Sequence, residues 1–438
     1  MRNQFKLATL ATIIFILITW RVNFPLIADD YGFALQGLSP DFNLRSFGPL
    51  LIHRPIASIV NFFIFKHRLY DHSKVLMTTF FFLHAFGFLG IANWLTANLS
   101  AKSSISKPVT KNLVSWQVCL IILCLYPSFH EVLYMTLNLP YSLGTFFLSG
   151  MLWSSQYWLR ILFMILAFCS LETYVLPMLI IPLTPILINI SKLKNFDDRV
   201  KLSIHVILWS IAFLIYFGIR WALEPAGDPW IHGLQFSLGN FLEHLKVYTN
   251  LLWTLHFYKE YWIFTLLEWI AFAITGIYLV TTKEIGKRET LILLFLPSVA
   301  SFHAFLMDYY APRAIHGAVV FKLAIIGYLL YLFCHKATGR WLQLMPACIL
   351  LTAYFGLSNR IFEIKTANAF TLQQKEQVWA EKMAQCHPRP DGTPCTLTMG
   401  NLGADLKRDW TLPAYSYESF LMWVKAKNKI DKPIIFRH

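Results

Sequence analysis

Long apolar runs separated by short polar segments dominate the first 357 positions of the chain. Because about 20 apolar residues cross a bilayer as a helix, these runs predict membrane spans over the ranges 7–20, 75–98, 113–127, 141–155, 160–173, 174–190, 203–221, 261–281, 290–306, 314–333 and 341–357. The shorter run 52–65 contains His53-Arg54-Pro55 and ends before Lys66-His67-Arg68. Its length and basic flanks predict a helix along the outer membrane interface rather than a span. The pattern indicates an all-α polytopic protein with about 11 membrane helices.

Basic residues fall in the loops at every second junction. They occur at Lys102, Lys107 and Lys111, in the loop 192–201, at Lys283, Lys287 and Arg288, and at Lys336 and Arg340. Loops rich in Lys and Arg stay in the cytoplasm, so we expect a cytoplasmic N-terminus and a C-terminus outside. A twelfth span at 52–65 would put the lysines of 98–112 on the wrong side.

The composition agrees with a membrane protein. Hydrophobic residues make up 56% of the chain and charged residues only 14%, against about 25% charged residues in soluble domains. This excludes a cytosolic enzyme, a secreted disulfide scaffold, a disordered chain and a β-barrel. The net charge of +14 is better explained by membrane lipids as partners than by nucleic acid, since basic loops face the anionic cytoplasmic leaflet.

Hydropathy falls after position 357. We therefore expect a transmembrane module over 1–357 and a small extracytoplasmic domain over 358–438. Cys386 and Cys395 lie in a polar, proline-rich stretch of this domain, where an oxidising compartment would allow a disulfide. No CxxC motif or His/Cys cluster indicates a metal site.

An acidic pair, Asp29-Asp30, follows the first span and precedes Tyr31-Gly32. Adjacent carboxylates repel each other, which makes one of them a stronger base that could activate a hydroxyl or bind a cation. A solvated surface pair is the alternative, but the position between a span and an interfacial helix favours a site. We expect Asp30 to be the base, because Gly32 allows a flexible turn. Asp29 would then orient Asp30, or bind the acceptor or a cation. Glu131 is the reserve candidate.

Cationic and aromatic groups lie near the same outer surface. Arg54, beside His53, could hold a phosphate with its planar donors or could only anchor lipid headgroups. Two further outer loops carry candidate ligands for a substrate: His130 and Glu131 in one, and Asp308, Tyr309, Tyr310 and Arg313 in the other. Tyrosines at an interface also form ordinary aromatic belts.

Three ionisable residues lie deeper in the predicted spans: Glu172, Glu268 and Lys322. A charge inside a bilayer costs about 3 kcal/mol or more and often marks a site. Lys322 could contact a phosphate together with Arg313, or could neutralise Glu172 or Glu268.

Asp29-Asp30 in the first outer loop, followed by His53-Arg54-Pro55 in a juxtamembrane helix, resembles the GT-C superfamily of polytopic glycosyltransferases. Within it, the chain is most similar to bacterial serotype-converting glucosyltransferases that modify O-antigen in lipopolysaccharide. The resemblance implies a multi-pass protein of the bacterial inner membrane with a periplasmic C-terminus. It also implies an undecaprenyl-phosphate sugar donor, a lipid-linked glycan acceptor, and inverting displacement with an Asp as base. Arg54, Arg313 and Lys322 would then stabilise the donor phosphate, and His53, Tyr31, His130, Asp308, Tyr309, Tyr310 and Glu172 would contact substrate.

Many members of that superfamily carry Asp-Glu where this chain has Asp-Asp, which leaves open which carboxylate is the base. The resemblance implies glucose as the transferred sugar. It implies no cofactor, because Arg and Lys can stabilise a departing phosphate without a metal ion. The use of a divalent metal is left open. Two alternatives remain: a lipid-linked sugar flippase or other transporter, and an O-antigen polymerase or ligase. No Walker loop, GxGxxG motif or internal repeat supports ATP-driven or repeat-based transport.

Overall fold

The computed structural model describes residues 2–19, 26, 29–100, 113–127, 135–188, 195–223, 242–243, 246–247, 250, 252–255, 262–302, 315–388, 393–400, 402, 406 and 416–437. Its first half contains α1 (Arg2–Thr19), α2 (Asp30–Gly37), η1 (Leu44–Phe47), α3 (Pro49–His53), α4 (Pro55–Lys66), η2 (Leu69–His72), α5 (Ser73–Ser100), α6 (Leu113–Cys124), η4 (Thr136–Ser142), α8 (Leu143–Trp153), α9 (Tyr157–Ser170), η5 (Glu172–Tyr174) and α10 (Val175–Leu187). The second half contains α11 (Phe196–Leu223), α13 (Trp262–Thr281), α14 (Lys287–Ala300), α15 (His316–Lys336), α16 (Arg340–Gln385), β1 (Cys395–Thr398), α17 (Tyr417–Lys427) and β2 (Ile434–Arg437).

The protein is predominantly α-helical and has the helices of a multi-pass membrane protein. Within the described residues, five helical segments are long and apolar enough to cross a bilayer: Leu69–Ser100, Phe196–Leu223, Trp262–Thr281, His316–Lys336 and Arg340–Gln385. The other expected spans correspond to shorter helices, such as α8, α9 and α10. The number of membrane crossings therefore stays a prediction.

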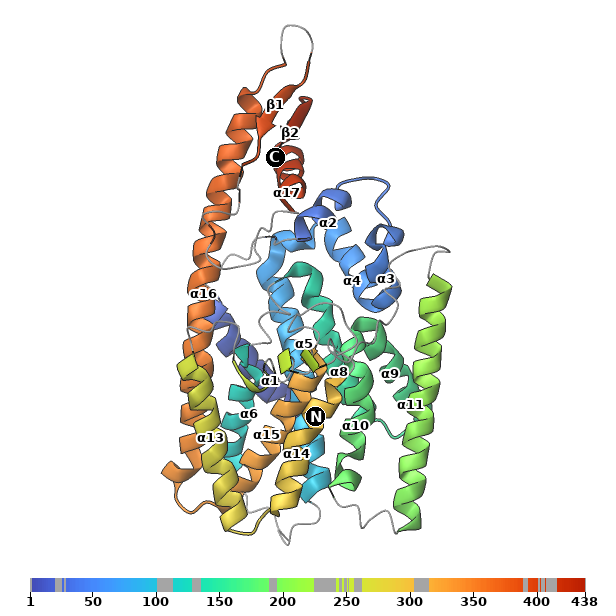
Figure 1. Cartoon of the computed structure of the whole chain (residues 1–438), viewed down its shortest axis with the longest axis vertical. Helices are drawn as coiled ribbons and strands as arrows, with labels where there is room; N and C mark the ends of the chain where they lie inside the picture. Colours follow the sequence, from blue (N-terminus) through green and yellow to red (C-terminus); the bar gives the residue numbers. More distant parts are fainter. Residues whose placement is uncertain are drawn as a thin grey trace.

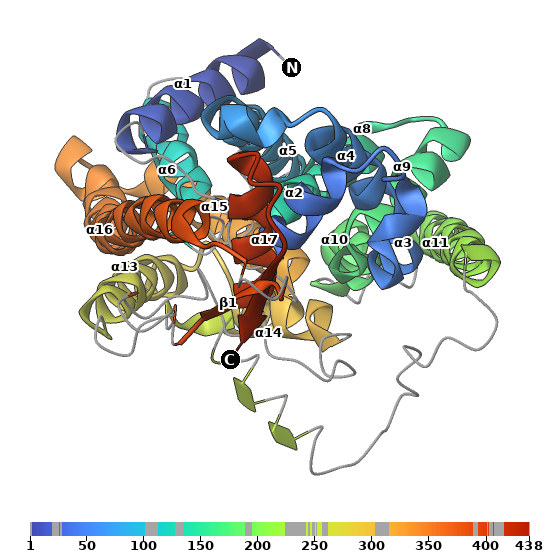
Figure 2. The same cartoon turned by 90° about the horizontal axis from the view of Figure 1, so that it is seen from above.

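Helix α15 forms the centre of the bundle. Of its most apolar 18 residues, 94% are buried. The helix packs against α5, α6, α13 and α14, which surround it in Figure 2. Indole N–H groups tie neighbouring helices to it and to each other: Trp116 donates to the carbonyl of Gly327 at 3.0 Å, and Trp153 donates to that of Gly90 at 2.9 Å. An indole N–H bonded to a backbone carbonyl satisfies a polar group that an apolar interior would otherwise leave unpaired.

Helix α11 has a different environment from α15. Only 22% of its most apolar 18 residues are buried. The helix lies at the edge of the bundle, beside α9, α10 and α3, in Figure 2. Large apolar side chains, including Leu214, Phe217 and Trp221, are exposed along it. Such a surface suits contact with lipid rather than water.

The region between the first span and α5 is built from short helices, because proline and glycine interrupt it. Pro55 follows Arg54, and a residue before proline seldom adopts helical backbone angles. The backbone of Arg54 accordingly has φ −139° and ψ 61°. The expected interfacial helix 52–65 is accordingly two helices, α3 and α4, that meet at Arg54. The break places the Arg54 side chain at a helix junction instead of on a continuous helix face.

Helix α16 joins the bundle to a C-terminal unit, which consists of β1, α17 and β2. The 46 residues of α16 reach about 69 Å at 1.5 Å per residue, and the unit lies beside its upper end in Figure 1. The expected domain boundary at 358 falls inside α16, so no break in the helix marks it. The strands pair in parallel, with Cys395 opposite Ile434, because α17 provides the crossover that a parallel pair requires.

The basic junctions of the second half share one end of the bundle. The turn between α13 and α14, the turn between α15 and α16, and the start of α11 lie at the lower end in Figure 1, opposite the C-terminal unit. This arrangement agrees with the alternation of basic loops in the sequence. Which end faces the cytoplasm stays a prediction.

Candidate functional site

The acidic pair begins helix α2, and its two members have different environments. Asp30 is fully buried, and its carboxylate oxygens accept the backbone N–H groups of Thr136 and Leu137 at 3.0 and 2.9 Å. These N–H groups belong to the first turn of η4, where no carbonyl of the helix itself is placed to accept them. Asp30 therefore caps η4 and fixes it to α2.

Asp29 precedes α2 as its N-cap residue and is exposed. Its side chain makes no capping hydrogen bond to the helix. Asp30 is poorly placed to be a base, because it is fully buried and both of its carboxylate oxygens already accept backbone N–H groups. The expectation that Asp30 faces a cavity does not agree with its contacts, and Asp29 is the accessible member of the pair.

Tyr31 follows the acidic pair and contacts the C-terminal unit. Its ring is fully buried and meets the rings of Phe420 and Trp423 edge-on, with centroids 5.1 and 5.3 Å apart. Its hydroxyl has no hydrogen-bond partner among the described residues. Tyr31 was expected to contact substrate, and in this structure it packs α2 against α17.

Arg54 forms a buried ion pair with Glu172. Its Nε and Nη2 atoms donate to the two carboxylate oxygens at 2.8 and 2.6 Å, and its Nη1 donates to the hydroxyl of Tyr141 at 2.7 Å. The guanidinium also lies 4.8 Å from the centroid of the Tyr141 ring. A two-bond pair of this kind is the strongest geometry that an Arg and a carboxylate can adopt. Arg54 thus joins the α3–α4 junction to η5 and to η4.

His53 pairs with an arginine that the sequence did not single out. Arg220 of α11 donates from Nη2 to His53 Nδ1 at 2.7 Å, and Tyr216 donates from its hydroxyl to the His53 carbonyl at 3.1 Å. Burial lowers the pKa of His53, and the positive charge of Arg220 lowers it further. His53 is therefore neutral at pH 7, with its proton on Nε2, because Nδ1 accepts from Arg220.

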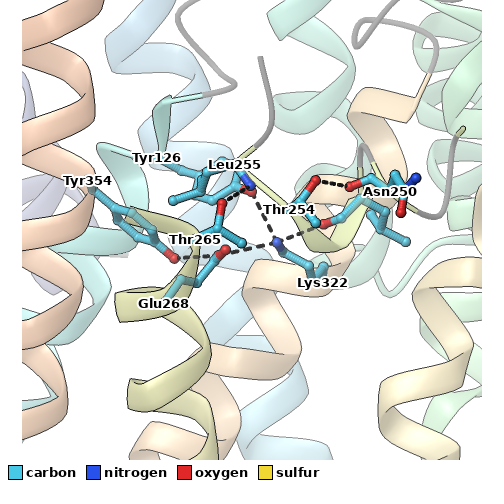
Figure 3. Close-up of polar contacts among 9 residues, drawn as sticks. Tyr126, Asn250, Thr254, Leu255, Thr265, Glu268, Lys322 and Tyr354 are labelled. Atoms are coloured by element: carbon cyan, nitrogen blue, oxygen red, sulfur yellow. Dashed lines mark hydrogen bonds and ion pairs between the residues drawn. The ribbon is translucent and has the colours of Figure 1, made fainter. Parts of the chain in front are cut away.

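Lys322 lies deep in the bundle and binds Glu268. Figure 3 shows its ammonium group directed toward the carboxylate of Glu268, which lies on α13. It donates to Glu268 at 3.3 Å, to the hydroxyl of Tyr126 at 3.0 Å and to the carbonyl of Leu252 at 2.8 Å. Tyr354 donates to the same Glu268 oxygen at 3.1 Å. Of the two carboxylates that Lys322 was expected to neutralise, Glu268 is the one it contacts.

These contacts leave Lys322 no donor for a phosphate, because an ammonium group has three N–H donors and each has an acceptor. Lys322 and Glu268 are 1% and 0% exposed. The arrangement is that of a neutralised pair inside the bundle. The second oxygen of Glu268, Oε2, has no partner among the described residues.

Several predicted site residues lie outside the described residues: His130, Glu131, Asp308, Tyr309, Tyr310 and Arg313. In the part of the chain that the structure describes, no group of three or more His, Cys, Asp or Glu side chains could hold a metal ion. Cys386 and Cys395 form a disulfide, with Cα atoms 5.9 Å apart. It connects the end of α16 to β1.

The outer cluster consists of residues joined by the hydrogen bonds above: His53, Arg54, Tyr141, Glu172, Tyr216 and Arg220. Sequence reasoning missed three of its members: Tyr141, Tyr216 and Arg220. Tyr141 and Tyr216 lie in apolar stretches where an aromatic side chain gives no signal of its own. Arg220 could have been found, because it stands alone near the outer end of a predicted span, where a cation needs either a partner or the headgroup region.

Comparison of the chain with protein-family models, with curated proteins and with solved structures finds no match.

Proposed function

We propose that the chain is a membrane glycosyltransferase that uses a polyprenyl-phosphate sugar as donor. It would transfer the sugar, glucose by the resemblance given above, to a lipid-linked glycan such as O-antigen, on the outer face of the bacterial inner membrane. The N-terminus would be cytoplasmic and the C-terminal unit periplasmic. The resemblance of Asp29-Asp30 and His53-Arg54-Pro55 to GT-C motifs supplies the reaction class.

One observation supports this proposal most strongly. The acidic pair and the basic-proline motif converge on η4: Asp30 binds its first turn, and Arg54 binds Tyr141 near its end. Both motifs lie at the end of the bundle that carries the C-terminal unit (Figure 1). Sugar transfer from a lipid phosphate requires the base and the phosphate-binding groups at one place, and this convergence of the two motifs supports such a site.

Asp29 is the base in this proposal, in place of Asp30. The acceptor hydroxyl oxygen attacks the anomeric carbon of the donor, and Asp29 takes the hydroxyl proton. The bond from the anomeric carbon to the phosphate oxygen breaks, and the phosphate leaves with the electron pair. This displacement inverts the configuration of the anomeric carbon. Because the leaving phosphate is already ionised, no general acid is needed. Asp30 acts as a positioning residue, since it holds the start of α2 on η4.

The test is transfer of radiolabelled glucose from synthetic polyprenyl-phosphate glucose to a lipid-linked glycan by the purified full chain. Asp29→Asn should lower the rate by about 100-fold or more, which is the usual contribution of a general base. Asp41→Asn is the matched control, because Asp41 is also exposed in the outer segment but only its backbone atoms make hydrogen bonds here. No transfer by the wild-type protein from any polyprenyl-phosphate sugar would reject the proposal.

A further inference from the structure

The cations of the outer cluster and of the bundle centre differ in how their charge is balanced. Arg54 and Lys322 each contact a carboxylate, Glu172 and Glu268 respectively. Arg220 contacts no carboxylate in the part of the chain that the structure describes. It gives one N–H to a neutral His53 and lies 5.8 Å from the centroid of the Tyr216 ring. Arg220 therefore keeps its positive charge and most of its donors.

His53 adds a second donor at the same place. A guanidinium can only donate, so the bond from Arg220 makes Nδ1 the acceptor and leaves the proton on Nε2. Within the described residues, no acceptor binds this N–H. Arg220 and His53 together present a cation and a neutral donor that Tyr216 holds in place through the His53 carbonyl.

The position of Arg220 along α11 matches the depth of lipid headgroups. It lies nineteen positions after Lys201, about 28 Å of helix at 1.5 Å per residue, which is close to the ~30 Å thickness of the hydrocarbon layer. Lys201 and Arg220 thus mark the two surfaces of the bilayer. Phe217 and Trp221 are next to Arg220 and are exposed, by 51% and 74%.

We propose that Arg220 and His53 bind the phosphate of a long-chain lipid whose tail lies along the exposed apolar side of α11. A phosphate oxygen can accept from the Arg220 guanidinium while another accepts from His53 Nε2. This inference rests on the proposed function in one respect, which is that the lipid is the polyprenyl phosphate of the sugar donor. The binding chemistry itself belongs to any lipid-borne phosphate.

The experiment measures binding of undecaprenyl phosphate to the full chain in phosphatidylcholine nanodiscs by native mass spectrometry. Arg220→Gln should raise the dissociation constant about tenfold or more, as expected for a lost charge-assisted contact. Lys201→Gln removes one charge from the other end of the same helix and should leave binding unchanged. Arg220→Lys keeps the charge and should retain part of the affinity, which separates lost binding from lost folding. Undecaprenol, which lacks the phosphate, should bind weakly to all variants.

Equal binding by wild type and Arg220→Gln would overturn the proposal. Displacement of undecaprenyl phosphate by an equal amount of phosphatidylglycerol would reject the polyprenyl phosphate as the specific ligand, because the site would then bind any anionic headgroup. Arg220-dependent binding of undecaprenyl phosphate supports the site even if no sugar transfer is detected, and that combination would reject only the proposed function.

Discussion

Asp30 and Arg54 are held by the same short helix, η4. Asp30 accepts the N–H groups of Thr136 and Leu137 at its start, and Arg54 donates to the hydroxyl of Tyr141 near its end. Asn61 adds a fourth bond, from its side-chain amide to the Leu137 carbonyl at 2.8 Å. The two outer motifs of the sequence are therefore fixed relative to each other through a segment that neither motif contains.

Asp30→Asn should lower the free energy of unfolding by about 1–3 kcal/mol. An amide has only one oxygen, so one buried N–H of η4 would lose its acceptor, and that is the usual cost of such a loss. Asp29→Asn should lower stability less than Asp30→Asn does, because Asp29 is exposed. Thermal unfolding of both variants in the same detergent checks this, and equal stability of the two would contradict the capping role of Asp30.

Arg54→Met should lower the free energy of unfolding by about 3–5 kcal/mol, because it leaves the Glu172 carboxylate mostly buried without its counter-ion. Glu172 is only 18% exposed at its side chain. The double variant Arg54→Met, Glu172→Leu should recover part of this loss, since both charges are then absent. A double-mutant cycle measured by unfolding tests the coupling. Additive losses would mean that the pair does not interact as described.

Lys322→Met should destabilise the protein to a similar extent, because Glu268 is fully buried. Lys322→Met combined with Glu268→Leu should be more stable than Lys322→Met alone. The transfer rate per folded molecule should stay at the wild-type value in the double variant. A selective loss of transfer with normal folding would restore the earlier expectation that Lys322 holds the donor phosphate.

Acid should destabilise the protein through His53. The pKa of His53 is lowered in the folded state, so His53 contributes stability above its unfolded pKa of about 6.5. That stability is lost as the pH falls below this value, since protonated Nδ1 cannot accept from Arg220. His53→Gln keeps an acceptor without a titrating group. The fall in melting temperature between pH 8 and pH 5.5 should therefore be smaller in His53→Gln than in wild type, and an equal fall would exclude this role.

Much of the helical framework could be predicted from the sequence, because apolar runs such as 75–98 and 203–221 carry a strong signal and lie within α5 and α11. The contacts between residues of the site could not be predicted from the sequence. Arg54 and Glu172 are 118 positions apart, and nothing local indicates that they meet. The role of Asp30 depends on backbone N–H groups of η4, which any sequence would provide. The continuation of α16 beyond 357 was missed because polar residues there ended the apolar run while the helix continued.

The most direct test is the rate of sugar transfer by Asp29→Asn relative to Asp41→Asn, with both proteins confirmed to be folded. The proposed function predicts that Asp29→Asn transfers about 100-fold or more slowly than wild type, while Asp41→Asn keeps the wild-type rate. Wild-type transfer by a folded Asp29→Asn protein would contradict the assignment of Asp29 as the base.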